Sequence, residues 1–135
     1  MKPRTGASFV LIILVGAVSL VVARSGPASA QEIRSGSYEQ QSGEGLYEGI
    51  CQGCHMPDAR GALGAGAYPA LANNPRLRAR MYPIIVVING QKAMPPFGSE
   101  LSDAQIASVV NYIRTRFGNR YEDKVSPAEV KAARR

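Results

Sequence analysis

The run Cys51-Gln52-Gly53-Cys54-His55 brings both cysteines and the only histidine of this 135-residue chain together. Its order, C-x-x-C-H, is typical of covalent haem attachment. Each thiol adds to a vinyl group of the porphyrin, and the neighbouring imidazole binds the iron. The motif therefore predicts a haem held by Cys51 and Cys54, with His55 as an axial ligand.

Three other chemistries use cysteines at this spacing. Structural zinc is almost always held by four N or S ligands, and the chain offers only two cysteines and one histidine. A Cys-x-x-Cys redox pair expects a βαβ context and leaves His55 without a role. A disulfide between such close cysteines would close a short, strained loop. Haem attachment uses all three side chains, and the redox pair and the disulfide remain as alternatives.

The beginning of the chain has the pattern of a secretory leader. Lys2 and Arg4 precede an almost wholly apolar run at 9–23, and Ala28-Ser29-Ala30 forms an A-x-A cleavage site. The run is shorter than the roughly 20 residues that a membrane-spanning helix needs, so an uncleaved anchor is the less favoured interpretation. We expect a leader at 1–30 and export to the periplasm without membrane anchoring.

The remaining chain is long enough for one small domain. We expect a flexible mature N-terminus at 31–40, a folded domain at 41–120 and a charged C-terminal tail at 121–135. A single core of this size is only marginally stable unless a large apolar group is added to it. A buried porphyrin would be such a group.

Charge is unevenly distributed after the leader. Removal of the leader takes away three basic residues and no acidic one, so the net charge falls from +6 to +3. Among the basic residues that gather in the later part are Arg76, Arg78, Arg80, Lys92, Arg114, Arg116, Arg120 and Lys124. A basic face would steer the protein towards an acidic partner, and the competing interpretation is a solvated surface without a special partner. No nucleic-acid-binding motif is visible, so nucleic acid is not an expected partner.

Two helices are predicted at the ends of the domain. Residues 41–50 carry apolar side chains three and four apart and lead directly into Cys51. Ser102-Asp103-Ala104-Gln105 has the form of a capping box, and Gly118-Asn119 provides a stop. The apolar face between these signals consists of Ile106, Val109, Val110, Ile113 and Phe117.

The segments between and after these helices are less regular. Residues 82–89 are apolar and β-branched, yet Pro83 at the start and Gly90 at the end favour a short helix over a strand. The glycine-rich run at 58–67 predicts a loop whose backbone could approach a flat ligand closely, and the alternative is that the glycines are only spacers in an exposed loop. The tail at 125–135 is interpreted as either a short helix or a disordered segment.

A second axial ligand is sought among the methionines. Met1 leaves with the leader, and Met56 adjoins the histidine and cannot reach the opposite face of the ring. Met94 lies in Ala93-Met94-Pro95-Pro96-Phe97-Gly98, where two prolines predict a rigid, extended loop. Met81 is more typical of a packing side chain. Met94 is therefore the predicted ligand, and Met81 or no protein ligand are the alternatives.

Together these features resemble the class I c-type cytochromes, over about residues 41 to 118. The resemblance implies an all-α cytochrome c fold, a small bundle of three to five helices around one covalently attached haem c, in which the first and last helices cross. The residues that carry it, besides C-x-x-C-H and the late Met-Pro, are Gly43, Leu46, Tyr47, Pro69 and Leu71.

The resemblance also implies roles for individual residues. Cys51 and Cys54 would hold the haem, His55 would be the proximal ligand of the iron, and Met94 the distal one. The Pro69 carbonyl would accept a hydrogen bond from the imidazole nitrogen that faces away from the iron. Leu71 would pack on the haem. Where the two helices cross, Gly43 would meet Tyr112 or one of its neighbours.

Within that family, three short motifs are similar to the cytochromes of bacterial periplasmic dehydrogenases with flavin or quinone cofactors. They occupy 68–75, 88–90 and 111–114, although Ala70 and Asn73 replace the second proline and the glycine of many such relatives. The resemblance implies an electron carrier rather than an enzyme, which takes electrons from a dehydrogenase and passes them to a respiratory-chain cytochrome or oxidase. An open-site haem protein, acting as a peroxidase or gas binder, is the alternative if Met94 does not bind the iron.

Overall fold

The computed structural model describes residues 38–134 except residue 65, and the fold is reported for that part of the chain. The leader predicted at 1–30 lies outside the described residues, as does most of the segment at 31–40. Within the described part, no helix has the length and apolar character needed to cross a membrane. The described chain is mostly helical, which confirms the predicted all-α fold.

The first helical segment ends at the histidine of the C-x-x-C-H motif. It consists of α1 (Gly43–Leu46), the π-helical turn η1 (Tyr47–Cys51) and α2 (Gln52–His55). The hydroxyl of Ser42 caps its first turn by accepting a backbone hydrogen bond at 3.0 Å. The helix predicted at 41–50 therefore starts two residues later and continues through the motif. Single π-helical turns inside helices are frequent at functional sites.

The predicted capping box opens the longest helix of the described residues, α4 (Asp103–Thr115). The Ser102 hydroxyl accepts a hydrogen bond from the Gln105 backbone N–H at 3.2 Å, and the Gln105 side chain accepts one from the Ser102 N–H at 2.9 Å. The helix ends just before Phe117 and Gly118, which have φ angles of 55° and 81°. This confirms both the start signal and the glycine stop.

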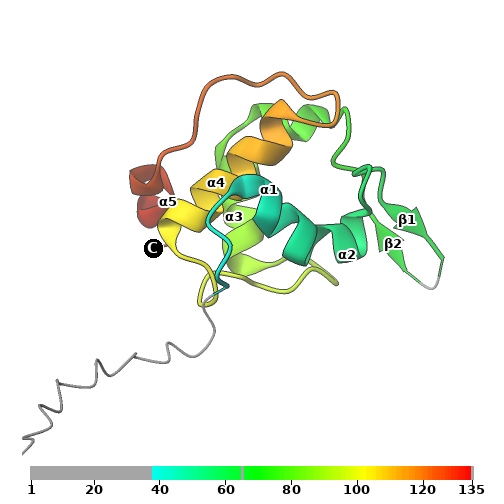
Figure 1. The fold of residues 1–135 in the computed structure, drawn as a ribbon, viewed down its shortest axis with the longest axis horizontal. Coiled ribbons are helices and arrows are strands. Elements are labelled where there is room, and N and C mark those ends of the chain that lie inside the picture. The colour runs from blue at the N-terminus through cyan, green and yellow to red at the C-terminus, as the bar shows by residue number, and fades with distance from the viewer. Residues whose placement is uncertain (1–37, 65, 135) are drawn as a thin grey trace, which may run out of the picture. The chain divides into compact units, whose positions relative to one another are not determined.

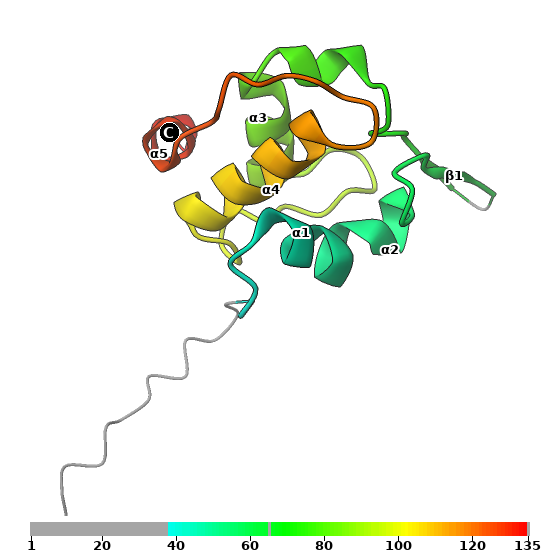
Figure 2. The same cartoon turned by 45° about the horizontal axis from the view of Figure 1, so that its top comes forward.

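The first and last helices of the predicted domain cross where glycine removes a side chain. Figures 1 and 2 show α1 lying against α4. A Cβ atom added to Gly43 would lie 2.3 Å from the carbonyl oxygen of Ser108 and 2.7 Å from Cβ of Tyr112. The implied contact between Gly43 and Tyr112 is thus confirmed, and only glycine fits at this crossing.

The apolar segment in the middle of the domain is a helix, as predicted. A short 3-10 turn, η2 (Pro75–Arg78), precedes α3 (Met81–Asn89), which starts one residue before the predicted segment. Pro83 lies in the first turn of α3, where its missing N–H is not needed. Gly90 ends the helix with a φ angle of 70°.

A small hairpin interrupts the segment predicted to be a loop. Strands β1 (Ala62–Leu63) and β2 (Ala67–Tyr68) pair antiparallel, with Ala62 opposite Tyr68. Figure 1 shows the hairpin extending away from the helices. Strands of two residues are too short to show an alternating pattern, which is why the sequence did not reveal them.

The segment left open between helix and disorder forms α5 (Pro127–Ala133). The Ser126 hydroxyl accepts a hydrogen bond from the Glu129 N–H, and the Glu129 carboxylate accepts one from the Ser126 N–H, so this helix also begins with a capping box. Val125 and Val130 are buried at 4% and 0% exposure. These two valines give the charged tail a core face that the sequence analysis did not recognise.

The core of the described part lies between the helices. Its largest fully buried apolar side chains come from α1, η1, η2, α3, α4 and α5. They are Leu46, Tyr47, Leu77, Ile84, Ile106, Val110 and Val130. At one end, the rings of Tyr47, Tyr112 and Phe117 form a cluster with centroid separations of 4.8 to 5.7 Å.

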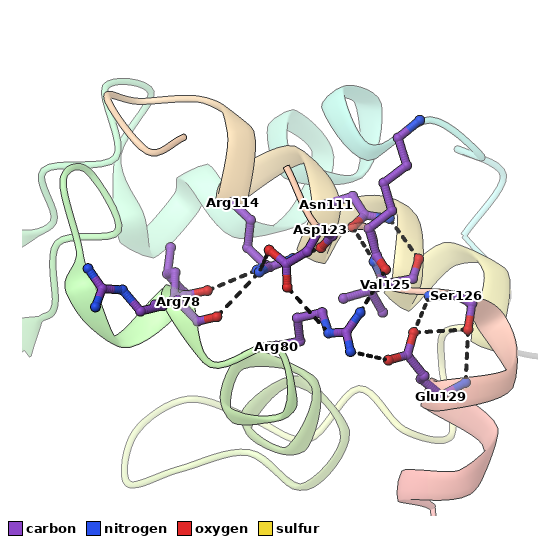
Figure 3. Close-up of polar contacts among 10 residues, drawn as sticks. Arg78, Arg80, Asn111, Arg114, Asp123, Val125, Ser126 and Glu129 are labelled. Atoms are coloured by element: carbon purple, nitrogen blue, oxygen red, sulfur yellow. Dashed lines mark hydrogen bonds and ion pairs between the residues drawn. The ribbon is translucent and has the colours of Figure 1, made fainter. Parts of the chain in front are cut away.

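Arg114 of α4 is fully buried and joins three segments (Figure 3). Its Nε donates a hydrogen bond to the Leu77 carbonyl at 2.8 Å, and its Nη2 pairs with the Asp123 carboxylate at 2.6 Å. Nη2 also donates to the Arg78 carbonyl, and Nη1 donates to the Asp123 carbonyl. A buried guanidinium is stable only with such partners. Arg114 therefore does not belong to the predicted basic face.

Arg80 is also engaged by acidic side chains (Figure 3). It lies 3.4 Å from the Asp123 carboxylate and 3.3 Å from that of Glu129, so it connects the start of α3 to the chain around α5. The hydrogen bond from Arg114 lowers the pKa of the Asp123 carboxyl. The hydrogen bond from the Ser126 backbone lowers the pKa of Glu129. Both carboxylates therefore stabilise the fold in their ionised forms.

Candidate haem site

A large cavity opens between the C-x-x-C-H helix, α3 and the loop that carries Met94. Its volume is about 1130 Å³, which exceeds the roughly 300 to 1,000 Å³ of most ligand pockets. Apolar side chains dominate its wall. Among the described residues that line it, Arg60, Arg76 and Lys92 are cationic and none is acidic. The cavity suits a large, flat, apolar group that carries anionic substituents.

His55 lies on the wall of this cavity with its ring oriented by a carbonyl group. The side chain is only 8% exposed, and its Nδ1 lies 2.9 Å from the carbonyl oxygen of Pro69. A carbonyl can only accept a hydrogen bond, so Nδ1 must carry the proton in this contact. The lone pair of Nε2 is then available to bind a metal ion.

Gly61 is the residue that allows the chain around Pro69 to approach the histidine. Its φ angle is 69°, and an added Cβ atom would lie 2.1 Å from the Tyr68 carbonyl oxygen and 2.8 Å from the Pro69 carbonyl carbon. Its own N–H donates to the His55 carbonyl at 3.0 Å. The glycine was expected to approach a flat ligand. It lines the cavity, and it also approaches the backbone that holds the imidazole.

Cys51 and Cys54 both line the cavity, and their thiols are not joined to each other. Cys54 is exposed, whereas Cys51 is partly buried. Burial, with a smaller contribution from Cys54, raises the pKa of the Cys51 thiol to about 11. Redox-active cysteines have lowered pKa values. The structure therefore favours neither the disulfide nor the redox pair.

The loop after α3 brings Met94 to the cavity. Gln91 and Met94 exchange backbone hydrogen bonds of 3.0 Å in both directions, which closes a tight turn. A Cβ atom at Gly90 would lie 2.5 Å from the Met94 carbonyl oxygen, so this glycine is needed for the turn as well as for the helix end. Met94 lines the cavity and is partly buried. Met81 is 45% exposed, is not among the residues that line the cavity, and does not pack in the core as expected.

Leu71 also lines the cavity, and an asparagine far along the chain holds its backbone. The side-chain amide of Asn119 donates to the carbonyls of Leu71 and Ile113, both at 2.8 Å, and its oxygen accepts from the Asn74 N–H at 2.9 Å. The Leu71 N–H donates to Ala59 at 2.8 Å. The sequence analysis treated Asn119 only as part of a helix stop.

Two further wall residues were not predicted. Tyr82 and Val86 lie four residues apart on α3 and line the cavity, as do the buried Pro83 and Val87 of the same helix, whereas Ile84 is buried without lining it. The available signal was that this segment is apolar on nearly every side. A helix of that kind must be covered on more than one face.

The residues around the cavity fit a covalently attached haem. Two free thiols, an imidazole with an available nitrogen and a thioether all line one apolar space, and its cations suit the propionate groups of a porphyrin. Fold and site together define the chain as a c-type haem domain.

Comparison with known proteins agrees with this class. Residues 39–113 match the family described as cytochrome c oxidase, cbb3-type, subunit III. The chain therefore belongs to this family of cytochrome c domains, whose cofactor is covalently bound haem c. The similar proteins are named as cytochromes or as cytochrome subunits, in agreement with the predicted electron carrier.

The similar proteins include cytochrome subunits of larger size. The chain is 32% identical over 117 residues to the cytochrome c subunit of alcohol dehydrogenase (quinone) from Gluconacetobacter polyoxogenes, covering 77% of this chain and 25% of that protein. It is 33% identical over 110 residues to the fructose dehydrogenase cytochrome subunit of Gluconobacter japonicus, covering 68% and 22%. The chain thus spans about a quarter of the length of these relatives.

A small cytochrome matches over almost its whole length. The chain is 35% identical over 82 residues to cytochrome c6 of Diacronema lutheri, covering 57% of this chain and 95% of that protein. The match over nearly the whole of a cytochrome c6 supports one haem domain within this chain.

Proposed function

We propose that this protein is a periplasmic electron carrier whose single haem c is attached to Cys51 and Cys54 and ligated by His55 and Met94. It accepts electrons from a dehydrogenase and passes them to a respiratory-chain cytochrome or oxidase. The observation that carries the proposal is the shared cavity, because it is lined by both cysteines, the oriented imidazole and the thioether. When bound, the haem iron supplies reversible one-electron transfer.

The side chains of the site have separate tasks in this proposal. The Pro69 carbonyl fixes the His55 ring and leaves Nε2 free to bind the iron. A thioether opposite an imidazole raises the reduction potential, and so does an apolar wall that excludes water. His55 and Met94 would both hold the iron, and substrates and oxygen would then have no open position on it.

A dehydrogenase with a quinone or flavin cofactor is the proposed electron donor. The relatives that are cytochrome subunits of alcohol and fructose dehydrogenases support this assignment. The chain itself also supports a docking surface for an acidic partner. The cations at the cavity are Arg60, Arg76 and Lys92, and Leu63 of the hairpin is an apolar side chain that is 91% exposed. The leader pattern at 1–30 supports the periplasmic location.

The ligand assignment is tested with the haem-loaded protein. The wild type and the control Met81→Ala should show the weak far-red methionine-to-iron band in the ferric state and should not bind carbon monoxide in the ferrous state. Met94→Ala should lose the band and bind carbon monoxide. A Met94→Ala protein that keeps the band would refute the assignment. A wild type that binds carbon monoxide and lacks the band would instead support a peroxidase or gas binder.

The donor is tested by affinity purification of the native protein from its own periplasm. We expect a flavoprotein or quinoprotein dehydrogenase to co-purify and to reduce the purified cytochrome directly. A dehydrogenase that co-purifies but does not reduce the haem would contradict the proposed direction of electron flow.

A further inference from the structure

Arg134, directly after α5, binds three acceptors in one short segment. Its guanidinium donates to the Leu101 carbonyl at 2.7 Å, to the Gly98 carbonyl and to the Asp103 carboxylate. The side chain is 27% exposed. A planar guanidinium is suited to such a set because its N–H groups form a rigid fork.

The segment that Arg134 holds is the continuation of the Met94 loop. On its other side this segment is attached to α3, because the N–H groups of Phe97 and Gly98 donate to the Val87 and Ile88 carbonyls at 2.9 and 3.1 Å. Leu101 is 5% exposed and lines the cavity, as do Met94 and Phe97. The segment 94–101 is therefore a wall of the cavity that is fastened to α3 and to Arg134.

The helix that carries Arg134 is itself well anchored. Its start has a capping box, Val130 is fully buried, and Glu129 pairs with Arg80 at 3.3 Å. None of these contacts involves residues 94–101. Loss of the Arg134 guanidinium would thus leave the Met94 segment held by its hydrogen bonds to α3 alone, without detaching α5.

We propose that Arg134 is a positioning residue for Met94, and that its guanidinium keeps the Met94 segment closed against the cavity. The inference rests on the proposed role of Met94 as iron ligand. Charge-assisted hydrogen bonds to two carbonyls and a carboxylate oppose opening of the segment, since opening would leave a partly buried cation and two carbonyls without partners.

The test uses imidazole as a probe that competes with Met94 for the iron of the ferric haem-loaded protein. The apparent dissociation constant of imidazole is inversely proportional to the fraction of molecules whose Met94 segment is open. Arg134→Gln should bind imidazole about tenfold more tightly than the wild type, the lower end of the effect of losing charge-assisted hydrogen bonds. Arg134→Lys, which keeps the positive charge, should have an imidazole affinity between those of the wild type and Arg134→Gln.

Arg80→Gln is the matched control, because it loosens α5 at its contacts with Asp123 and Glu129 and leaves the Met94 segment untouched. Its imidazole affinity should equal that of the wild type. A second measurement, amide hydrogen exchange of Phe97 and Gly98, should be accelerated in Arg134→Gln only. If Arg134→Gln does not accumulate as folded protein, Asp103→Asn, which removes the negative charge of one acceptor of Arg134, should bind imidazole about threefold more tightly.

Suppose that the far-red band is present in the wild type and absent from Met94→Ala, so that the ligand assignment holds. An unchanged imidazole affinity in Arg134→Gln, or an equal increase of that affinity in Arg80→Gln, would then overturn only the inference about Arg134. A band that persists in Met94→Ala would refute the ligand assignment and this inference together. The two failures are thus distinguishable.

Discussion

The Nδ1 atom of His55 lies 2.9 Å from the carbonyl oxygen of Pro69, 14 residues further along the chain. This contact decides which imidazole nitrogen is left for the iron, since the carbonyl requires a proton on Nδ1. It depends on a backbone contact between Gly61 and the Tyr68-Pro69 peptide that no side chain could replace. The geometry of the iron ligand is therefore set by residues that lie outside the C-x-x-C-H motif.

Gly61→Ala should destabilise the haem-loaded protein by roughly 1 to 3 kcal/mol, because the residue has a positive φ and its methyl group would meet the Tyr68 carbonyl. Denaturant unfolding measures the change. Gly64→Ala is the matched control, since an added Cβ atom there meets no atom within 4 Å and its stability should change little. Equal stabilities of the two variants would contradict the proposed role of Gly61.

Gly43→Ala should separate α1 from α4 and cost about 1 to 3 kcal/mol of unfolding free energy, as expected for overpacking a close contact. Gly49→Ala lies in the same helical segment, but its nearest atoms are 3.7 Å away in the Gln40 side chain. We expect that variant to be as stable as the wild type or slightly more stable. A neutral Gly43→Ala would show that the helix crossing can readjust.

The Asp123 carboxylate should make stability depend on pH in the acidic range. Because hydrogen bonding from Arg114 lowers its pKa in the folded state, its contribution is present above the pKa of the unfolded chain and is lost as the pH falls through the lower, folded value. Asp123→Asn removes the titrating group and keeps an acceptor oxygen. The unfolding free energies of the wild type and the variant, measured from neutral pH downwards, should converge on acidification. Curves that stay parallel would exclude a role for this carboxylate.

The cations at the cavity should govern the rate of electron transfer from the dehydrogenase. Arg76→Glu and Lys92→Glu should each lower the second-order rate of haem reduction several-fold at low ionic strength, and the difference should vanish at high salt. Stopped-flow reduction measures this. Arg120→Glu makes the same charge change at a residue that does not line the cavity and should have a smaller effect. A salt-independent rate would refute electrostatic steering.

Much of the helical structure was predictable because its signals are local. The capping box at Ser102 and the glycine stop at Gly118 lie within the helix they delimit, and both were confirmed. Pro83 and Gly90 correctly favoured helix over strand for an apolar, β-branched segment. The hairpin and the packing of α5 were not foreseen, since strands of two residues and a helix with one fully buried valine give almost no periodic signal.

By itself, the sequence determined the chemistry of this protein. Two thiols and an imidazole in five consecutive residues indicate covalent haem whatever the fold, and the two prolines after Met94 mark its loop. The tertiary structure alone decided how that chemistry is held. It showed that Arg114 is buried, that Asn119 holds the Leu71 backbone, and that Arg134 holds the Met94 segment. These contacts join residues that are distant in the chain, so no local pattern encodes them, and a charged or amide side chain is expected at the surface until the carbonyls that surround it are known.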